Sequence, residues 1–446
     1  MKKFLLTPFE STLIRGLFAL YFYFAYPSLF RVSFDQQPYP HGLAQYVDLT
    51  IFGDPNIQIF LYVGVLVALV FYSMGRFMIA SLVFLLIATI GPATLLYSQG
   101  FINHGSHIFP LVLLGQLLAY TYGFISKHLF PNLINVKRID SIAFFFSLQM
   151  IASVYVASGI SKLIASHGEW PLQAPNLAPY VMRDYAEEYY AKLEYGVLER
   201  GEWIGHLIIE NSEFFVVLFI IALLTELMTF LAVSSRSLAF FVGIGLILMH
   251  EGIAWTMNVN FRHNEFIVFL FFILPFLTQR IAMWKLFAKV DSKRITLTSR
   301  KTPRFISILN RIPLKLMLCI VVLGLIVQEW YPFSAFPMYA NLSPQAHYYF
   351  VTDENKKPIS TFREFNLPDS APVKIIRTRL HYHAATALTM KDESDVGKQF
   401  LRYLLNIRKP KEPPEYRQLL LWKATISLNN KSIIKQEYPV ASIDLP

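Results

Sequence analysis

A lysine at the end of an apolar stretch is the residue of this sequence best suited to do chemistry. Lys162 closes the run 155–163 and has no carboxylate near it in the sequence. An ammonium at membrane depth costs about 2.5–3.5 kcal/mol on insertion scales, so an ionisable side chain there is a functional candidate. Desolvation favours the neutral amine, which can act as a base. The alternative is a helix-end side chain that extends its charge to the membrane interface.

The composition indicates the environment in which this lysine acts. Of the 446 residues, 54% are hydrophobic and only 16% are charged, and the mean hydropathy is +0.42. A soluble fold of this length could not cover so much apolar side chain, so the sequence predicts an α-helical polytopic membrane protein. About nine stretches approach the roughly 20 residues that a bilayer crossing requires. They run approximately over 11–30, 56–74, 77–97, 107–126, 141–162, 213–233, 238–258, 264–279 and 313–333.

Basic residues between the apolar stretches predict the orientation. Cytoplasmic loops carry the excess of Lys and Arg, and the segment 279–311 holds nine of them against a single Asp291. The shorter basic loops fall on the same side of nine crossings. We therefore predict a cytoplasmic N-terminus, a basic cytoplasmic loop at 279–311 and an exported C-terminus. Such a loop on a membrane protein more often meets anionic lipid headgroups than nucleic acid, so no nucleic-acid partner is expected.

Two polar regions are expected on the exported side. The segment 165–212 intersperses acidic residues with tyrosines, which suits a piece lying at the headgroup level. A small α+β domain, 336–446, is predicted to follow a transmembrane domain, 1–335. Within it we predict strands at 347–352 and 373–381, a helix at 394–406, and a hairpin of 418–427 with 432–437. The single cysteine, Cys319, precedes this domain, so no disulfide is expected there.

The predicted topology gathers the polar residues of the apolar region near the exported side. Asn103 and His104 fall in a short exported loop, and Lys162 ends its span on that side. His250 and Asn258 occupy the outward half of another span. This grouping predicts one cavity in the outer leaflet. An ordinary turn at 103–104 and a hydrogen-bonded core position for His250 stay open as alternatives.

The same residues carry a resemblance to a known family. The run Tyr155-x-Ala157-x-Gly159-x-x-Lys162-Leu163, followed by Trp170, resembles a signature of the vitamin K-dependent γ-carboxylases and their bacterial horizontally transferred transmembrane-domain (HTTM) relatives. Asn103-His104 and the pair His250 and Asn258 are similar to further elements of the family, and Glu226 to an acidic residue of the preceding span. The resemblance covers approximately 10–335. The sequence departs from vertebrate carboxylases at Ser161, where they carry a second lysine, and in its smaller exported part.

The resemblance implies a reaction and a location. In this family a reduced quinone, vitamin K or menaquinone, is converted to its epoxide by O2, and this is coupled to carboxylation of a glutamyl side chain by CO2. Lys162 would be the base that deprotonates the quinone, and His104 would assist. The quinone site would further include Asn103, Tyr155, His250 and Asn258. The expected partners are the lipid bilayer, the quinone and a peptide or protein glutamyl substrate, in the cytoplasmic (inner) membrane of a bacterium.

Other motifs and functional classes are weaker. The spacing His104-x-x-His107 suggests metal ligands, and His250-Glu251 resembles the start of a zinc-protease helix, but the second histidine that such a helix needs four residues later is absent. We therefore expect no metal site. Two alternatives to the carboxylase-like enzyme stay open: a non-catalytic HTTM membrane protein that helps to mature or secrete a peptide, and a small-molecule transporter. The sequence shows no internal repeat of the kind many transporters have.

The charge asymmetry generates a topology prediction. Reporter fusions placed after Arg300 and after Pro446 should report opposite compartments, because the first position lies in the basic loop and the second follows one more crossing. Paired reporters that are active only in the cytoplasm or only outside it measure this. If both fusions report the same compartment, the stretch 313–333 does not cross the membrane.

Overall fold

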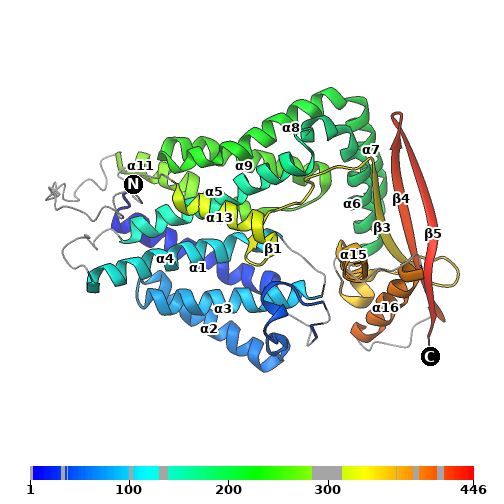
Figure 1. The fold of residues 1–446 in the computed structure, drawn as a ribbon, viewed down its shortest axis with the longest axis horizontal. Helices are drawn as coiled ribbons and strands as arrows, with labels where there is room; N and C mark the ends of the chain where they lie inside the picture. Colours follow the sequence, from blue (N-terminus) through cyan, green and yellow to red (C-terminus); the bar gives the residue numbers. More distant parts are fainter. Residues whose placement is uncertain are drawn as a thin grey trace.

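The computed structural model describes residues 4–31, 36–37, 39–99, 104–129, 139–283, 314–367, 369–384, 391–408 and 416–445. These residues form a mostly helical body with a small sheet at the C-terminal end of the chain (Figure 1). Among the described residues, seven helical stretches are long and apolar enough to cross a membrane. They are α1 (Pro8–Phe30), α2 (Pro55–Ser73), α3 (Met78–Tyr97), the 3-10 turn η4 (His104–Ser106) with α4 (Ile108–Leu129), α5 (Ile139–Ala165), α8 (Ser212–Leu227) with the 3-10 turn η7 (Met228–Val233), and α9 (Arg236–Met257).

These seven stretches coincide with seven of the nine predicted crossings, while the other two differ in form. The stretch 264–279 is divided into α10 (Arg262–Val268), a π-helical turn (Phe269–Ile273) and α11 (Leu274–Met283). The last stretch forms α13 (Lys315–Val327), whose 13 residues span only about 20 Å. A hydrocarbon core is about 30 Å thick, so a count of nine stays a prediction.

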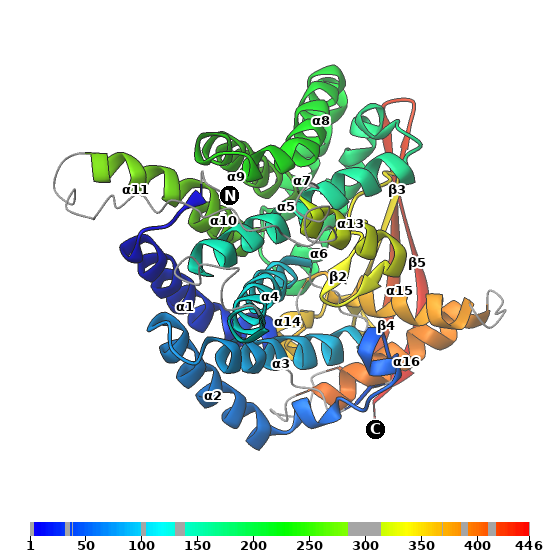
Figure 2. The ribbon, with the colours of Figure 1, turned by 60° about the vertical axis from the view of Figure 1, so that its left-hand side comes forward.

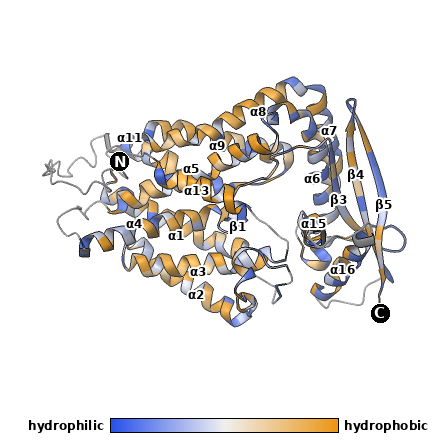
Figure 3. Ribbon diagram, viewed as in Figure 1, coloured by the Kyte–Doolittle hydropathy of each residue, from blue (hydrophilic) through white to orange (hydrophobic). Residues whose placement is uncertain are grey.

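The helix α5 is the centre of the bundle. Within its most apolar 18 residues 83% are buried, against 28% for α8 and 22% for α9. Figure 2 shows α8 and α9 on one side of the bundle, α2 and α3 on the other, and α4 and α5 between them. The apolar residues that α8 and α9 expose are those expected of helices that face lipid. Hydrophobic residues dominate the helices of the bundle, whereas the sheet and the helices beside it contain many hydrophilic residues (Figure 3).

Buried ion pairs tie the helices together at the end of the bundle near the N-terminus. The helix α1 begins with a capping box, in which the side chains of Thr7 and Glu10 each bond the other's backbone N–H. The second carboxylate oxygen of Glu10 lies 2.6 Å from Arg236 Nη1, at the start of α9. Arg236 also donates to the carbonyl of Pro275 in α11. One buried guanidinium therefore joins three helices.

The C-terminal region is a three-stranded antiparallel sheet covered on both faces. The strands β3 (Gln345–Thr352), β4 (Gln418–Asn429) and β5 (Ser432–Asp444) pair in that order. Alternate residues face opposite sides of a sheet. Tyr349 and Val351 therefore pack against α15 (Ala371–Ala384) and α16 (Lys391–Ile407) with the short α14 (Thr361–Phe365), whereas Tyr348 and Phe350 pack against α6 (Leu177–Lys192).

Most elements predicted for this region are confirmed, and one is wrong. The strand at 347–352, the helix at 394–406 and the hairpin are present. The predicted strand at 373–381 is instead part of helix α15. Over a short run its apolar residues fit both the two-residue repeat of a strand and the 3.6-residue repeat of a helix. In the structure, Ala371, Ile375 and Ile376 form one buried helical face against α16. Arg379 lies on the same side, with its guanidinium 5.2 Å from the ring centroid of Tyr403.

The segment 165–212 lies between α5 and α8 in the sequence and packs against the sheet. It forms the 3-10 turn η6 (Trp170–Asn176), α6 and α7 (Val197–Glu210). The N-terminus lies at one end of the body and the sheet at the other (Figure 1), as the predicted orientation requires, although the bilayer and its sidedness remain predictions. Residues 284–311 of the predicted basic loop and Asn103 lie outside the described residues.

A buried cluster of charges holds α6 against the chain that leads to the sheet. Arg183 Nη2 lies 2.5 Å from Asp184 Oδ1, and the Tyr339 hydroxyl donates to Asp184 Oδ2 at 3.0 Å. Glu187 lies farther away, with Oε1 3.7 Å from Arg183 Nε. Burial raises the pKa of Glu187 to about 8; Arg183 opposes this shift and Asp184 adds to it. Glu187 is therefore the weakly compensated acid of the cluster.

The raised pKa of Glu187 predicts a stability that falls as pH rises. The folded-state pKa of about 8 exceeds the usual 4.5, so between these values the folded protein holds a proton that the unfolded chain has released. The contribution of Glu187 to the free energy of unfolding is complete below about pH 4.5 and is lost as pH rises through 8. Over this range the free energy of unfolding falls by up to about 1.4 kcal/mol per pH unit. Thermal unfolding in detergent at pH 6 and pH 9 measures it. Glu187→Gln should reduce the difference, while the exposed control Glu199→Gln should not; equal pH dependence in both variants contradicts the assignment.

Candidate functional site

A cavity of about 720 Å³ lies among α5, α8 and α9. Its walls are mostly aliphatic and aromatic, which is typical of small-molecule sites of this size. The polar residues of the wall are His104, Tyr155, Ser158, Lys162, Asn211, Thr225, Glu226, His250, Thr256 and Asn264. Trp170, Phe336 and Tyr339 add aromatic surface from segments outside these three helices.

Two opposite charges face each other in the cavity wall. Lys162 Nζ in α5 lies 2.5 Å from Glu226 Oε1 in α8. Lys162 is 8% exposed and Glu226 is 4% exposed, so the lysine side chain does not extend to the protein surface. Two unpaired charges would each cost several kcal/mol at such burial, and their attraction offsets that cost. The second oxygen of Glu226 is buried and has no hydrogen-bond partner among the described residues.

The residues before Lys162 explain how the two charges come together. An added Cβ on Gly159 would lie 2.9 Å from Leu227 Cδ2 and 3.5 Å from Glu226 Cβ. The absence of a side chain at Gly159 therefore lets α8 approach α5 closely, as small residues do in membrane helix pairs. Ser158, one residue earlier, donates to the same oxygen of Glu226 at 3.2 Å. The spacing of serine, glycine and lysine thus forms one surface that receives the carboxylate.

Trp170 covers the ammonium from the turn that follows α5. Lys162 Nζ lies 4.8 Å from the centroid of the Trp170 ring, within the range of a cation–π contact. The indole Nε1 donates to the carbonyl of Tyr339 at 2.8 Å. The tryptophan is therefore oriented by the segment that leads to the sheet, so the last part of the chain shapes the wall next to Lys162.

Several buried polar atoms of the cavity wall have no hydrogen-bond partner among the described residues. They are His104 Nδ1, the Tyr155 hydroxyl, Glu226 Oε2, His250 Nδ1 and Asn264 Oδ1. The His250 ring stacks on Phe261 with 4.9 Å between centroids and lies 5.7 Å from the ring of Tyr155. Buried polar groups in native proteins normally have partners. A polar ligand in the cavity would supply them.

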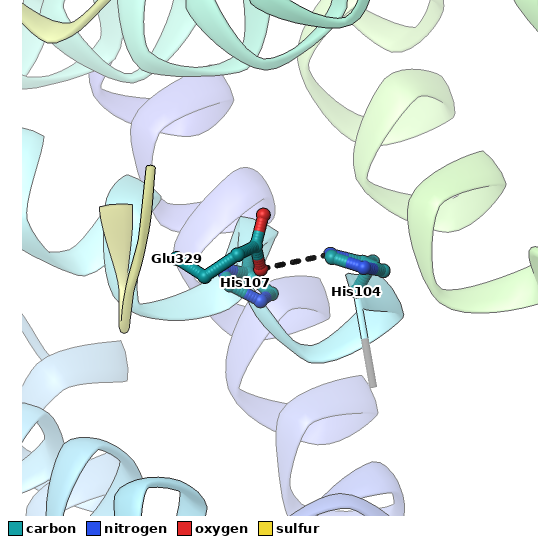
Figure 4. A group of neighbouring side chains, drawn as sticks. All are labelled: His104, His107 and Glu329. Atoms are coloured by element: carbon teal, nitrogen blue, oxygen red, sulfur yellow. Dashed lines mark ion pairs between the residues drawn. The ribbon is translucent and has the colours of Figure 1, made fainter. Parts of the chain in front are cut away.

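A second polar group adjoins the cavity at His104. One ligand atom each from His104, His107 and Glu329 lies within 4.8 Å of the others. Figure 4 shows these side chains close together; they come from η4, the turn residue before α4 and the strand β1 (Glu329–Trp330). His104 Nδ1 is 3.9 Å from Glu329 Oε2. The ring of His107 bonds Tyr97 and the carbonyl of Pro332. The sequence spacing links the two histidines, but Glu329 is more than 200 residues away and no local pattern connects it to them.

The structure brings together four of the six residues proposed from sequence for the quinone site. His104, Tyr155, Lys162 and His250 line the same cavity. Asn258 does not: it ends α9 in a left-handed conformation and its side chain donates to Glu188. Asn103 lies outside the described residues.

Glu226 is the residue whose role the sequence left unassigned. It is the one carboxylate between residues 214 and 233, within an apolar helix. An acid at that depth was itself a signal of a buried partner. The sequence alone did not identify the partner, because Glu226 and Lys162 are 64 positions apart.

Searches against protein-family models, curated proteins and solved structures each found no significant match for this chain. The resemblance to carboxylase-like proteins therefore rests on the residues of the sequence alone.

The ion pair predicts a specific pattern of stability. Lys162→Met should destabilise the protein by about 3–5 kcal/mol, because it leaves Glu226 as an uncompensated buried charge. The double variant Lys162→Met/Glu226→Leu should recover most of that loss, since apolar residues of similar volume can replace a buried pair. Thermal unfolding of the detergent-solubilised variants measures both. Additive losses in the double variant would show that the two side chains do not interact.

Proposed function

We propose that this chain is an integral membrane enzyme of the vitamin K-dependent carboxylase type, which binds a reduced quinone in the cavity and removes its proton with Lys162. The observation that carries the proposal is the buried Lys162–Glu226 pair in the wall of a mostly apolar cavity. A structural ion pair alone does not require a cavity of about 720 Å³ beside it.

The cavity suits a flat, mostly apolar molecule with a few oxygen atoms. Its volume lies within the roughly 300–1,000 Å³ of typical ligand sites. The Tyr155 hydroxyl and the His250 Nδ1 atom, which have no partner in the part of the chain that the structure describes, offer hydrogen bonds to quinone oxygens, and the aromatic side chains offer stacking surface. His104 faces the same space. These residues fit a quinone ring, and the apolar residues of α8 and α9 fit its isoprenoid tail.

The paired side chains can act as a base without carrying a net charge beforehand. The pair is neutral overall whether the shared proton resides on Lys162 Nζ or on Glu226 Oε1. When the carboxylate holds this proton, the amine is neutral and can accept another from a bound hydroxyl. The pair then has a net positive charge beside the oxygen that lost its proton. Glu226 would therefore be the group that takes the proton from Lys162 before the amine acts as a base.

The surroundings support chemistry that must exclude water. A reduced quinone, when bound, supplies the electrons with which O2 is reduced, and in carboxylases of this type that oxidation drives the addition of CO2 to a glutamyl side chain. Trp170, Phe336 and Tyr339 cover the Lys162 region with aromatic surface. A dry site strengthens the attraction between the charged groups and protects reactive species. The α6–α7 segment and the sheet provide surface on which a glutamyl peptide could be bound.

The activity test uses the protein in lipid with a short-chain reduced menaquinone, O2 and bicarbonate, with and without a glutamyl peptide. Lys162→Ala should abolish epoxide formation, and Lys162→Arg should fail too, because a guanidinium stays protonated. Glu226→Gln should lower the rate by about 10²-fold or more, as loss of a positioned acid–base group does. His104→Ala should lower it less.

Two further variants separate chemistry from folding. The double variant Lys162→Met/Glu226→Leu should be folded and inactive. His263→Gln should keep wild-type activity, because His263 hydrogen-bonds Tyr21 and is not part of the cavity wall. Wild-type protein that binds the quinone but forms no epoxide under any peptide condition would overturn the enzyme proposal and favour the non-catalytic alternative.

A further inference from the structure

We propose that His104, His107 and Glu329 form a binding site for a divalent transition metal ion of the zinc type. The site is distinct from the Lys162–Glu226 pair and does not depend on the proposed activity. Its donor atoms come from residues 104–107 and from Glu329, which is at least 222 positions later in the sequence. One atom of each side chain lies within 4.8 Å of the others (Figure 4).

The distance between His104 and Glu329 is the first argument. His104 Nδ1 and Glu329 Oε2 are both buried, both lack a hydrogen-bond partner among the described residues, and lie 3.9 Å apart. That distance exceeds a direct hydrogen bond, which needs about 2.7–3.2 Å. It is also shorter than the roughly 4.5 Å left by a water that bonds both atoms at tetrahedral angles. An ion with bonds of about 2.0–2.2 Å to each atom fits between them.

The hydrogen bonds of His107 supply the second argument. Its Nδ1 lies 3.1 Å from the carbonyl oxygen of Pro332, which can only accept, so this nitrogen carries the hydrogen. The other nitrogen, Nε2, therefore holds a lone pair, and the Tyr97 hydroxyl bonds to it. A carbonyl that binds one ring nitrogen while the other is left for a metal is the usual outer-shell arrangement of ligating histidines. On metal binding the Tyr97 hydroxyl would leave Nε2 or become a fourth ligand.

The types of donor identify the class of ion. Two imidazoles and one carboxylate suit zinc or a neighbouring first-row ion, with water or Tyr97 completing the shell. Magnesium and calcium prefer oxygen donors throughout. His107 is fully buried, so the surroundings are dry and the carboxylate of Glu329 offsets part of the charge of the ion. Shortening these separations, which extend up to 4.8 Å, by at most about 1.4 Å would bring all three atoms to the roughly 3.4 Å separation of ligands around zinc.

The position of the site suggests what the ion would do. It would join η4, before α4, to the short hairpin of β1 and β2 (Phe333–Ser334) that follows α13. His104 and Phe336 on either side of this junction line the cavity. Coordination through Nδ1 would also leave a hydrogen on His104 Nε2, so His104 would remain a hydrogen-bond donor. The metal would thus hold one wall of the cavity and set the tautomer of His104.

The test measures binding of Zn²⁺ alone to the full-length protein in detergent, after treatment with a chelator. Calorimetric titration and elemental analysis should give one Zn²⁺ per chain for the wild type. Glu329→Gln and His104→Gln should each weaken binding at least 10-fold, in line with the loss of a ligand. His263→Gln and Glu265→Gln, which change the same residue types outside the group, should bind as the wild type does.

A spectroscopic variant keeps the test independent of folding losses. Glu329→Cys retains a metal ligand, so with Co²⁺ it should show a thiolate-to-cobalt charge-transfer band that the wild type lacks. Folded wild-type protein that takes up no Zn²⁺, or equal binding by wild type and Glu329→Gln, would overturn the proposal. So would a Glu329→Cys variant that binds Co²⁺ without this band. None of these readouts involves quinone turnover, so they leave the proposed function untouched.

Discussion

A buried lysine must be neutralised inside a low-dielectric bundle, and the Lys162–Glu226 contact that satisfies this requirement organises the site around it. The two charges meet because Gly159 lets α8 approach α5 and Ser158 adds a hydrogen bond to the same carboxylate oxygen. Neither side chain can be removed alone without a large loss of stability, since the remaining charge would be buried without a partner. The cavity borders this contact. The pair of residues that neutralises the buried charges in the folded protein is therefore also the candidate reactive group.

The same requirement is met differently at the two ends of the body. Near the N-terminus, Arg236 is surrounded by Glu10 and backbone carbonyls, so its charge is fully matched and serves to join helices. Near the sheet, Arg183 faces two acids, of which Asp184 is well bonded and Glu187 is not. Glu187 is therefore the group expected to titrate near neutral pH. Compensated charges thus stabilise the body, and incompletely compensated ones mark the places that respond to pH or ligands.

The segment between α13 and the sheet links these features. Its carbonyls at 332, 335 and 339 accept from His107, Ser161 and Trp170 respectively. Glu329 in the same segment faces His104, and the Tyr339 hydroxyl bonds the charge cluster of α6. A stretch with little regular structure therefore contacts the proposed metal site, the cavity wall and the support of the sheet. A displacement of this segment would therefore change the contacts in all three regions, because they are made by residues of one continuous stretch of backbone.

The sequence by itself determined the elements whose signal is local. Long apolar runs predicted the seven apolar helical stretches, alternation predicted β3 and the hairpin, and the position of Lys162 marked the cavity. Local periodicity failed at 373–381, where a short apolar run suits both a strand and a helix until α16 supplies the face against which it packs. Only the tertiary structure paired Lys162 with Glu226, grouped Glu329 with His104 and His107, and placed Asn258 outside the cavity wall. The physical reason is that charge compensation and ligand geometry depend on distances in space between residues far apart in the chain, which no local pattern encodes.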